Sequence, residues 1–211
     1  MARGCFILLF MLVISSFTYA DDPVGFGLKY GFSSSTFYTS SDNVTNISAR
    51  NGLFLGGFLN FPIAEVIDIQ PEFHYTRKGA TVTVSHQASE EAAPQSVQAE
   101  WRSSYIDIPL LFNVTFPFGK AIKPHMVFGP SLNFITSWEV LPVDPYIAGN
   151  ATTIQNFDLA TIFGFGASYD WVHPGQIFCD VRYMLGTTNI HEFFGVALKN
   201  ATLSLNVGYR F

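Results

Sequence analysis

The sequence predicts an all-β fold: an eight-stranded, antiparallel, up-and-down transmembrane β-barrel. Three observations predict it: segments that alternate between apolar and polar residues, their recurrence about eight times along the chain, and a scarcity of charged residues. The clearest alternating segment is residues 201–211, since the side chains of a strand point alternately to opposite faces. Its apolar face holds Leu203, Leu205, Val207, Tyr209 and Phe211.

Composition indicates that much of the surface does not face water. Charged residues make up 13% of the 211 residues and hydrophobic residues 48%, whereas a soluble domain usually carries about 25% charged residues. The formal net charge of −5 disfavours a nucleic-acid partner, because a phosphate backbone binds basic surfaces. The length fits one domain.

Residues 1–20 are predicted to be a secretory signal peptide. Arg3 precedes an apolar run from Phe6 to Ile14, and small residues precede the expected cleavage after Ala20. The run is shorter than the roughly 20 apolar residues of a spanning helix, which disfavours a membrane anchor. We therefore expect residues 21–211 to form the barrel domain.

Four strands are expected in the N-terminal half of the mature chain. Apolar residues occupy one parity and polar residues or glycines the other, less regularly in the second strand, where glycines oppose bulky residues as in a narrow, curved barrel. The strands are about Val24–Ser33, Asn51–Phe61, Val66–Lys78 and Ser103–Phe116. Their apolar faces include Phe26 and Leu28, then Leu53 and Leu55, then Ile69 and Phe73, then Ile108 and Leu110.

Four more strands follow the same rule. They are about Pro124–Ile135, Phe157–Tyr169, Gln176–Gly186 and 201–211, with apolar faces that include Phe128 and Leu132, Phe163 and Phe165, Val181 and Tyr183, and Leu205 and Val207. Short turns alternate with longer connections. The longer ones are Ser34–Arg50, Gly79–Arg102, Ser137–Asn156 and the medium loop Thr187–Leu198.

This layout is that of an outer-membrane barrel, with short periplasmic turns and long extracellular loops. Closure is required in a bilayer because an open sheet edge would leave backbone groups unpaired in hydrocarbon. The four strands that run toward the short turns each end their apolar face on an aromatic residue. We expect these residues to form a periplasmic aromatic girdle: Phe61, Phe116, Tyr169 and Phe211.

The main structural alternative is a soluble, lipocalin-like barrel that binds a ligand inside. That fold has an apolar lumen and a polar exterior. Here one face of the strands carries several ionisable groups that could pair inside a narrow barrel, which favours the membrane barrel.

Several short motifs, in order, resemble the PorT-like outer-membrane β-barrel proteins of Bacteroidetes. They are residues 69–79 (IQPEFHYTRKG), 105–111 (YIDIPLL), 128–132 (FGPSL) and 181–186 (VRYMLG). The resemblance implies an outer-membrane barrel, inserted by the barrel-assembly machinery that recognises a terminal aromatic such as Phe211. It also implies, through the name-giving member, a link to protein secretion.

The polar strand faces hold a candidate lumen charge network. Its members are Lys29, Asp68, Glu72, His74, Asp107, His125, Asp158, Asp180, Arg182 and Arg210. Ionisable groups at membrane depth are often functional, so an ion or proton path is one interpretation. The favoured one is a structural plug, because acids and bases occur in comparable numbers and an unpaired buried charge is costly.

Catalysis has weak support. His191 and Glu192 beside Thr187 and Thr188 would be the site of a lipid-modifying enzyme, but the Gly-x-Ser-x-Gly elbow is missing. We expect no catalytic residues, no cofactor and no metal, since the spacing of the histidines does not match a metal site. Trp101 and Trp138 are expected at the rim of the long loops as interface anchors or contact points.

The sequence thus predicts a non-enzymatic, monomeric barrel integral to the outer membrane that anchors or presents loops in the cell envelope. The partners expected are outer-membrane lipid, the barrel-assembly machinery and an envelope or secretion-system protein. The alternatives are a narrow porin-like channel for small solutes or ions, a lipid-modifying enzyme and the lipocalin-like binder.

Overall fold

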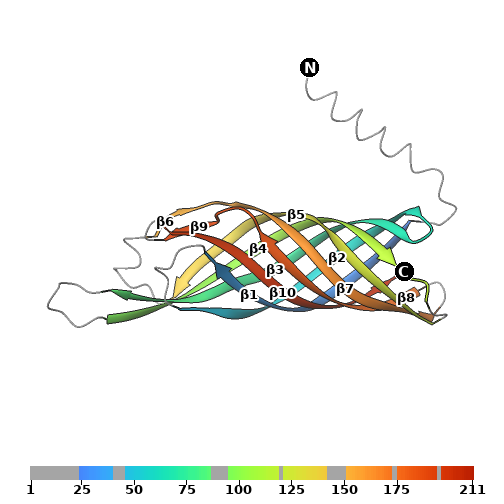
Figure 1. Cartoon of the computed structure of the whole chain (residues 1–211), viewed down its shortest axis with the longest axis horizontal. Coiled ribbons are helices and arrows are strands. Elements are labelled where there is room, and N and C mark those ends of the chain that lie inside the picture. The colour runs from blue at the N-terminus through green and yellow to red at the C-terminus, as the bar shows by residue number, and fades with distance from the viewer. Residues whose placement is uncertain are drawn as a thin grey trace, which may run out of the picture.

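Eight long strands form a closed antiparallel barrel in this computed structural model, which describes residues 24–39, 46–86, 95–118, 121–141, 151–172, 175–193 and 196–211 (Figure 1). The barrel strands are β1 (Gly25–Tyr38), β2 (Asn46–Ala64), β3 (Ile67–His86), β4 (Gln95–Thr115), β5 (Ile122–Leu141), β7 (Phe157–Val172), β8 (Gly175–Gly186) and β10 (Val196–Arg210). The predicted signal peptide lies outside the described residues.

The pairing order confirms the predicted fold class. Each barrel strand pairs with its neighbour in the chain, and β1 closes the wall against β10. The closing register runs from Gly27 opposite Arg210 to Tyr38 opposite Lys199. Because the wall closes on itself, its backbone groups are paired without a free edge along that seam.

The wall separates an apolar exterior from a filled interior. On β1, Leu28, Tyr30 and Phe32 are 59%, 59% and 65% exposed, whereas Lys29 and Ser33 on the opposite face are buried. The period of two along each strand produces this inversion of the soluble pattern. In the described part of the chain, no helix has the length and apolar character needed to cross a membrane.

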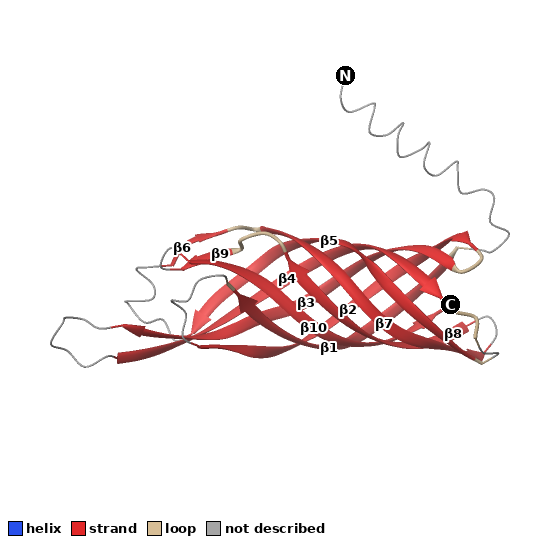
Figure 2. Cartoon of the chain, viewed as in Figure 1, coloured by secondary structure: helices blue, strands red, loops and turns tan. Residues whose placement is uncertain are grey.

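The two ends of the barrel differ in the length of their connections. The β2–β3, β4–β5 and β7–β8 connections are short, and we call this the short-turn end; the C-terminus lies there (Figure 2). At the opposite, long-loop end, β3 and β4 project furthest from the barrel (Figure 1). The predicted alternation of short and long connections is confirmed.

The strand ends at the long-loop end correct the predicted loops. Ser34–Arg50 and Gly79–Arg102 were expected to be loops, yet β1 and β2 reach Tyr38 and Asn46, and β3 and β4 continue to His86 and Gln95. Two short strands, β6 (Ala151–Ile154) and β9 (His191–Phe193), occupy the other expected loops and pair beside the start of β10. The barrel wall therefore continues beyond the expected membrane boundary as paired sheet.

Candidate functional site

A buried network of ion pairs fills the middle of the lumen, and Glu72 on β3 is at its centre. The Glu72 carboxylate accepts hydrogen bonds from Lys29 Nζ at 2.7 Å and from Arg182 Nη1 at 2.9 and 3.0 Å. His74 Nε2 lies 3.0 Å from Glu72 Oε2, and the Gln70 amide donates at 2.5 Å. Glu72 thus joins β1, β3 and β8 across the barrel axis.

Arg182 connects this carboxylate to a second one. Its Nε and Nη2 atoms donate to the two oxygens of Asp180 at 2.7 and 2.9 Å, a two-point contact that fits the planar guanidinium. Asn206 on β10 also donates to Asp180, and His125 Nε2 lies 3.8 Å from it. Two cations, Lys29 and Arg182, therefore face two carboxylates in a water-poor interior, where each would be costly alone.

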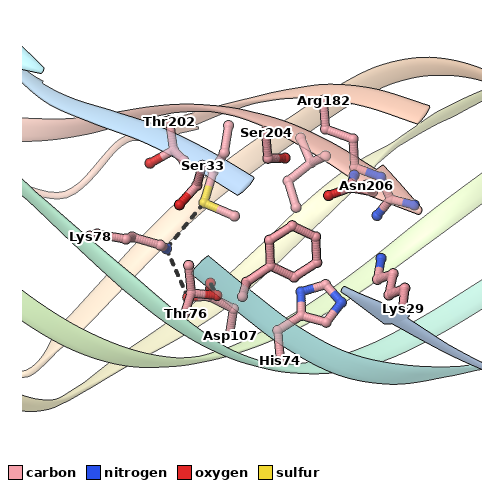
Figure 3. A pocket seen from close by; sticks show the side chains of 13 residues that line it. Lys29, Ser33, His74, Thr76, Lys78, Asp107, Arg182, Thr202, Ser204 and Asn206 are labelled. Carbon is pink, nitrogen blue, oxygen red and sulfur yellow. Dashed lines mark hydrogen bonds and ion pairs between the residues drawn. The ribbon is translucent and has the colours of Figure 1, made fainter. Parts of the chain in front are cut away.

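A second cluster lies nearer the long-loop end. Lys78 Nζ donates to Asp107 at 2.8 Å, and Thr76 Oγ1 donates to the same carboxylate at 2.8 Å. The ammonium also lies 4.4 Å from the centre of the Tyr105 ring and 3.4 Å from Met184 Sδ. Figure 3 shows this cluster at one side of the cavity and Arg182 and Lys29 at the other.

An apolar cluster closes the lumen on the long-loop side of these charges. It consists of Phe37, Ala80, Val82, Ala99, Trp101, Ile190 and Leu198, all buried, with Ile47 and Val140 packed against it. The sequence interpretation placed Trp101 at the rim as an interface anchor or contact point, but this side chain is only 2% exposed and points into the lumen. That prediction is wrong, because the barrel wall continues past the level at which the loop was expected to begin.

The remaining space in the middle of the lumen is small and divided. Two cavities of ≈ 30 Å³ each lie on either side of Arg182, which lines both. Each has room for about one or two water molecules. A wider hollow of ≈ 530 Å³ opens at the short-turn end, lined in part by Asp68, Lys123 and Arg210. The arrangement is a plugged barrel with a mouth at one end.

The structure brings together most of the predicted charge network. Lys29, Glu72, His74, Asp107, His125, Asp158, Asp180 and Arg182 are buried in the lumen. Asp68 and Arg210 lie apart from them at the short-turn mouth, 3.7 Å from each other. Asp158 faces Asn133 across the β5–β7 ladder and forms no ion pair with another described residue.

Sequence reasoning missed Lys78, which is as buried as Lys29. Lys78 has the same parity as Glu72, His74 and Thr76, so the alternation carried the signal. It was missed because the strand was expected to end there. The predicted network also contained no cation to pair with Asp107, and Lys78 is the residue that does so.

The barrel has an apolar exterior, a plugged lumen and closed pairing, and its sequence agrees with this architecture. The sequence model of a family described as outer membrane protein beta-barrel domain matches residues 18–192. The chain belongs to this family. As a member it is an integral protein of the outer membrane, as predicted. The match is to the general barrel family, and the narrower PorT-like resemblance remains a prediction.

Solved structures of outer-membrane barrels resemble this one in fold. OprG of Pseudomonas aeruginosa aligns with a TM-score of 0.52 at 13% identity, over 89% of this chain and 95% of OprG. Neisserial surface protein A aligns with a TM-score of 0.51 at 14% identity, over 90% of this chain and 98% of that protein. At such identities the likeness shows the fold alone. No curated protein matches the chain by sequence.

The predicted girdle residues of this outer-membrane barrel all lie near its short-turn end. Phe211 is 50% exposed and stacks on Phe26 at 4.8 Å between ring centres, and Tyr169 is 44% exposed beside Trp171. Phe61 and Phe116 are half-buried, and Phe116 stacks on Phe118. The aromatic band is therefore wider than predicted, since Phe26, Phe118 and Trp171 join it.

The proposed catalytic alternative gains little from the geometry. The side chains of His191 and Glu192 lie outside the described part of the structure. Thr187 Oγ1 donates to the backbone oxygen of Leu159 at 2.8 Å, and Thr188 Oγ1 accepts from the Leu159 amide at 3.0 Å. Both hydroxyls therefore bind the backbone near the start of β7. In the described ranges, no three His, Cys, Asp or Glu side chains gather into a metal-holding group.

Proposed function

We propose that this protein is a non-enzymatic, non-conducting outer-membrane barrel that presents its strand extensions at the long-loop end to a protein of the cell envelope. The observation that carries the proposal is the plug: Glu72, Arg182 and Asp180 cross the lumen, and the cluster around Trp101 closes it above. A lumen filled in this way favours a scaffold over a narrow channel.

The extensions supply the surface for presentation. β3 and β4 remain paired from Gly79 opposite Arg102 to His86 opposite Gln95. Their inner side is anchored because Val82 and Ala99 are buried in the apolar cluster. Binding residues are often carried by projecting segments on a rigid scaffold. The PorT-like resemblance supports a partner that acts in protein secretion, and we propose that the barrel itself is monomeric.

The proposal is tested by shortening the hairpin without disturbing the plug. Val82 and Ala99 face each other across the ladder, so an Asn-Gly turn can join them in register. We expect an envelope protein to co-purify with the tagged full-length barrel from gently solubilised membranes, and to be lost with the shortened barrel. Retention of the heat-modifiable gel shift would show that the shortened protein folds. Co-purification that survives the shortening, or no partner for either protein, would contradict the proposal.

A further inference from the structure

Three arginines gather on the outer wall of the barrel, just beyond its apolar belt on β2 to β5. Arg50, Arg77 and Arg102 line an open hollow of ≈ 360 Å³ together with Ser104, Trp138 and Glu139. The described residues contain five arginines, so most of them lie here. The position is separate from the plugged lumen and lies at the base of the β3–β4 extension.

The strand register fixes the level of this hollow. Tyr75, Ile106 and Phe134 form one row across β3, β4 and β5, and they end the apolar face. The next outward rows are Arg77, Ser104 and Ser137, then Gly79, Arg102 and Glu139. The change from apolar to polar or charged residues therefore occurs at one height on three adjacent strands. That height marks the interface of the leaflet at the long-loop end, which in an outer-membrane barrel is the outer leaflet.

The charges in the hollow do not cancel. Glu100 accepts from Arg50 Nε at 2.7 Å and from Arg102 Nε and Nη2 at 3.0 and 3.1 Å, and Glu139 lies 3.4 Å from Arg102 Nη1. Arg77 forms no ion pair with another described residue and is exposed. Three guanidinium groups thus face two carboxylates, which leaves one positive charge beside the bilayer.

The backbone makes room for this cluster. Gly79 lies in the same row as Arg102, and a Cβ atom there would lie 3.1 Å from Arg50 Cδ and 2.0 Å from the backbone oxygen of Trp101. The Arg50 side chain therefore occupies the space that a side chain at position 79 would need. Trp138 is 49% exposed and lines the same hollow.

We infer that this hollow binds the phosphate group of an outer-leaflet glycolipid, with Arg77 as the main contact and Arg102 and Arg50 beside it. A guanidinium matches phosphate because it can donate two parallel hydrogen bonds. The apolar row of Tyr75, Ile106 and Phe134 directly below would contact the acyl chains of the same molecule. A lipid satisfies both surfaces at once, whereas a free anion would contact only the charged one.

The test uses the folded mature barrel in detergent and three probes: diphosphoryl lipid A, its phosphate-free counterpart and inorganic phosphate. Native mass spectrometry would count bound molecules and give the dissociation constants. We expect diphosphoryl lipid A to bind the wild-type barrel, and Arg77→Gln to bind it about tenfold more weakly, as expected when a charge-assisted contact is lost. The phosphate-free lipid should bind both proteins equally weakly.

Lys123→Gln is the matched control, because Lys123 pairs with Asp170 at 2.9 Å at the opposite rim. It removes the same charge and should leave lipid A binding unchanged. The inference is overturned if Arg77→Gln binds lipid A as tightly as the wild type, or if the phosphate-free lipid binds as tightly as lipid A. Displacement of lipid A by inorganic phosphate at comparable concentration would also overturn it, in favour of a free anion.

Discussion

At the scale of single residues, Arg182 explains why so many charges can be buried together. It holds Glu72 and Asp180 through four donor contacts between 2.7 and 3.0 Å, and Lys29 supplies the second cation. Such a set is held by mutual pairing, so that removing one member leaves another charge uncompensated. Each member of the network can therefore be tested by a single substitution that removes its charge.

The replacement Glu72→Gln should lower the free energy of unfolding by about 3–5 kcal/mol, the usual result of breaking a buried pair. Glu139→Gln removes the same charge from a side chain that is 57% exposed and should cost less than about 1 kcal/mol. Urea unfolding of both variants in lipid vesicles would measure the difference. Equal effects of the two substitutions would contradict a paired carboxylate at Glu72.

Glu100 at the outer rim should respond to acid. Hydrogen bonds from Arg102 and then Arg50 lower its pKa from 4.5 to about 2. The contribution of Glu100 to stability is therefore present above about pH 4.5 and is lost as the pH falls toward 2. The ¹³C shift of the Glu100 carboxyl should titrate near pH 2 in the wild type and at higher pH in Arg102→Gln. The same midpoint in both proteins would exclude Arg102 as the cause.

At the scale of elements, glycines on the strands make space for aromatic rings inside a narrow barrel. Phe58 and Phe178 meet edge to face in the lumen at 5.4 Å between ring centres. A Cβ atom on Gly27 would lie 2.3 Å from Phe58 Cζ, and one on Gly208 would lie 2.3 Å from Phe178 Cζ. The rings thus occupy the volume that side chains on β1 and β10 would fill.

Gly27→Ala should therefore destabilise the barrel by about 1–3 kcal/mol through overpacking. Gly57→Ala, on the neighbouring strand, is the matched control, since its Cβ would meet no atom closer than 3.4 Å. Urea midpoints of the two variants should differ clearly. A loss of stability that is the same in both would point to backbone effects of the strand, without any role for the Phe58 ring.

The elements also show where sequence reasoning succeeds and fails. Alternation correctly predicted which side chains face lipid: Leu28 and Leu205 were placed outside, and their sequence neighbours Lys29 and Asn206 were placed in the lumen. Beyond Lys78 the apolar residues change from the outer face of the strand to the inner face. Ala80 and Val82 point inward, and the outer face becomes polar. Outside the bilayer a barrel follows the rule of soluble proteins, with apolar side chains inside. The sequence interpretation expected lipid outside throughout, so it took this paired segment for a loop.

The two tryptophans distinguish these interpretations. Trp101 is 2% exposed and Trp138 is 49% exposed, although both were expected at the rim. Trp101→Ala should cost about 3–5 kcal/mol, as for other buried aromatic truncations, and Trp138→Ala much less. Thermal or urea unfolding followed by circular dichroism would compare them. A larger loss for Trp138→Ala would contradict the apolar cluster at the long-loop end.

At the scale of the whole molecule, the interior is layered along the barrel axis. A mouth at the short-turn end leads to the Phe58 and Phe178 rings, then to the Glu72 network, the Lys78 cluster and the apolar cap. The sequence could not predict which charged residues pair within these layers, because partners such as Lys29 and Glu72 come from strands that are not neighbours in the sheet. Parity placed them in the lumen, and only the closed geometry brought them into contact.

Planar-bilayer recording of the wild-type barrel tests the central claim, a closed lumen, most directly. Insertion would be verified first by the heat-modifiable gel shift of the reconstituted protein. The plug predicts no steady single-channel conductance, because Arg182 and its two carboxylates separate cavities of ≈ 30 Å³ each. Steady, ohmic conductance of the inserted wild-type protein would contradict the closed lumen and the non-conducting role proposed from it.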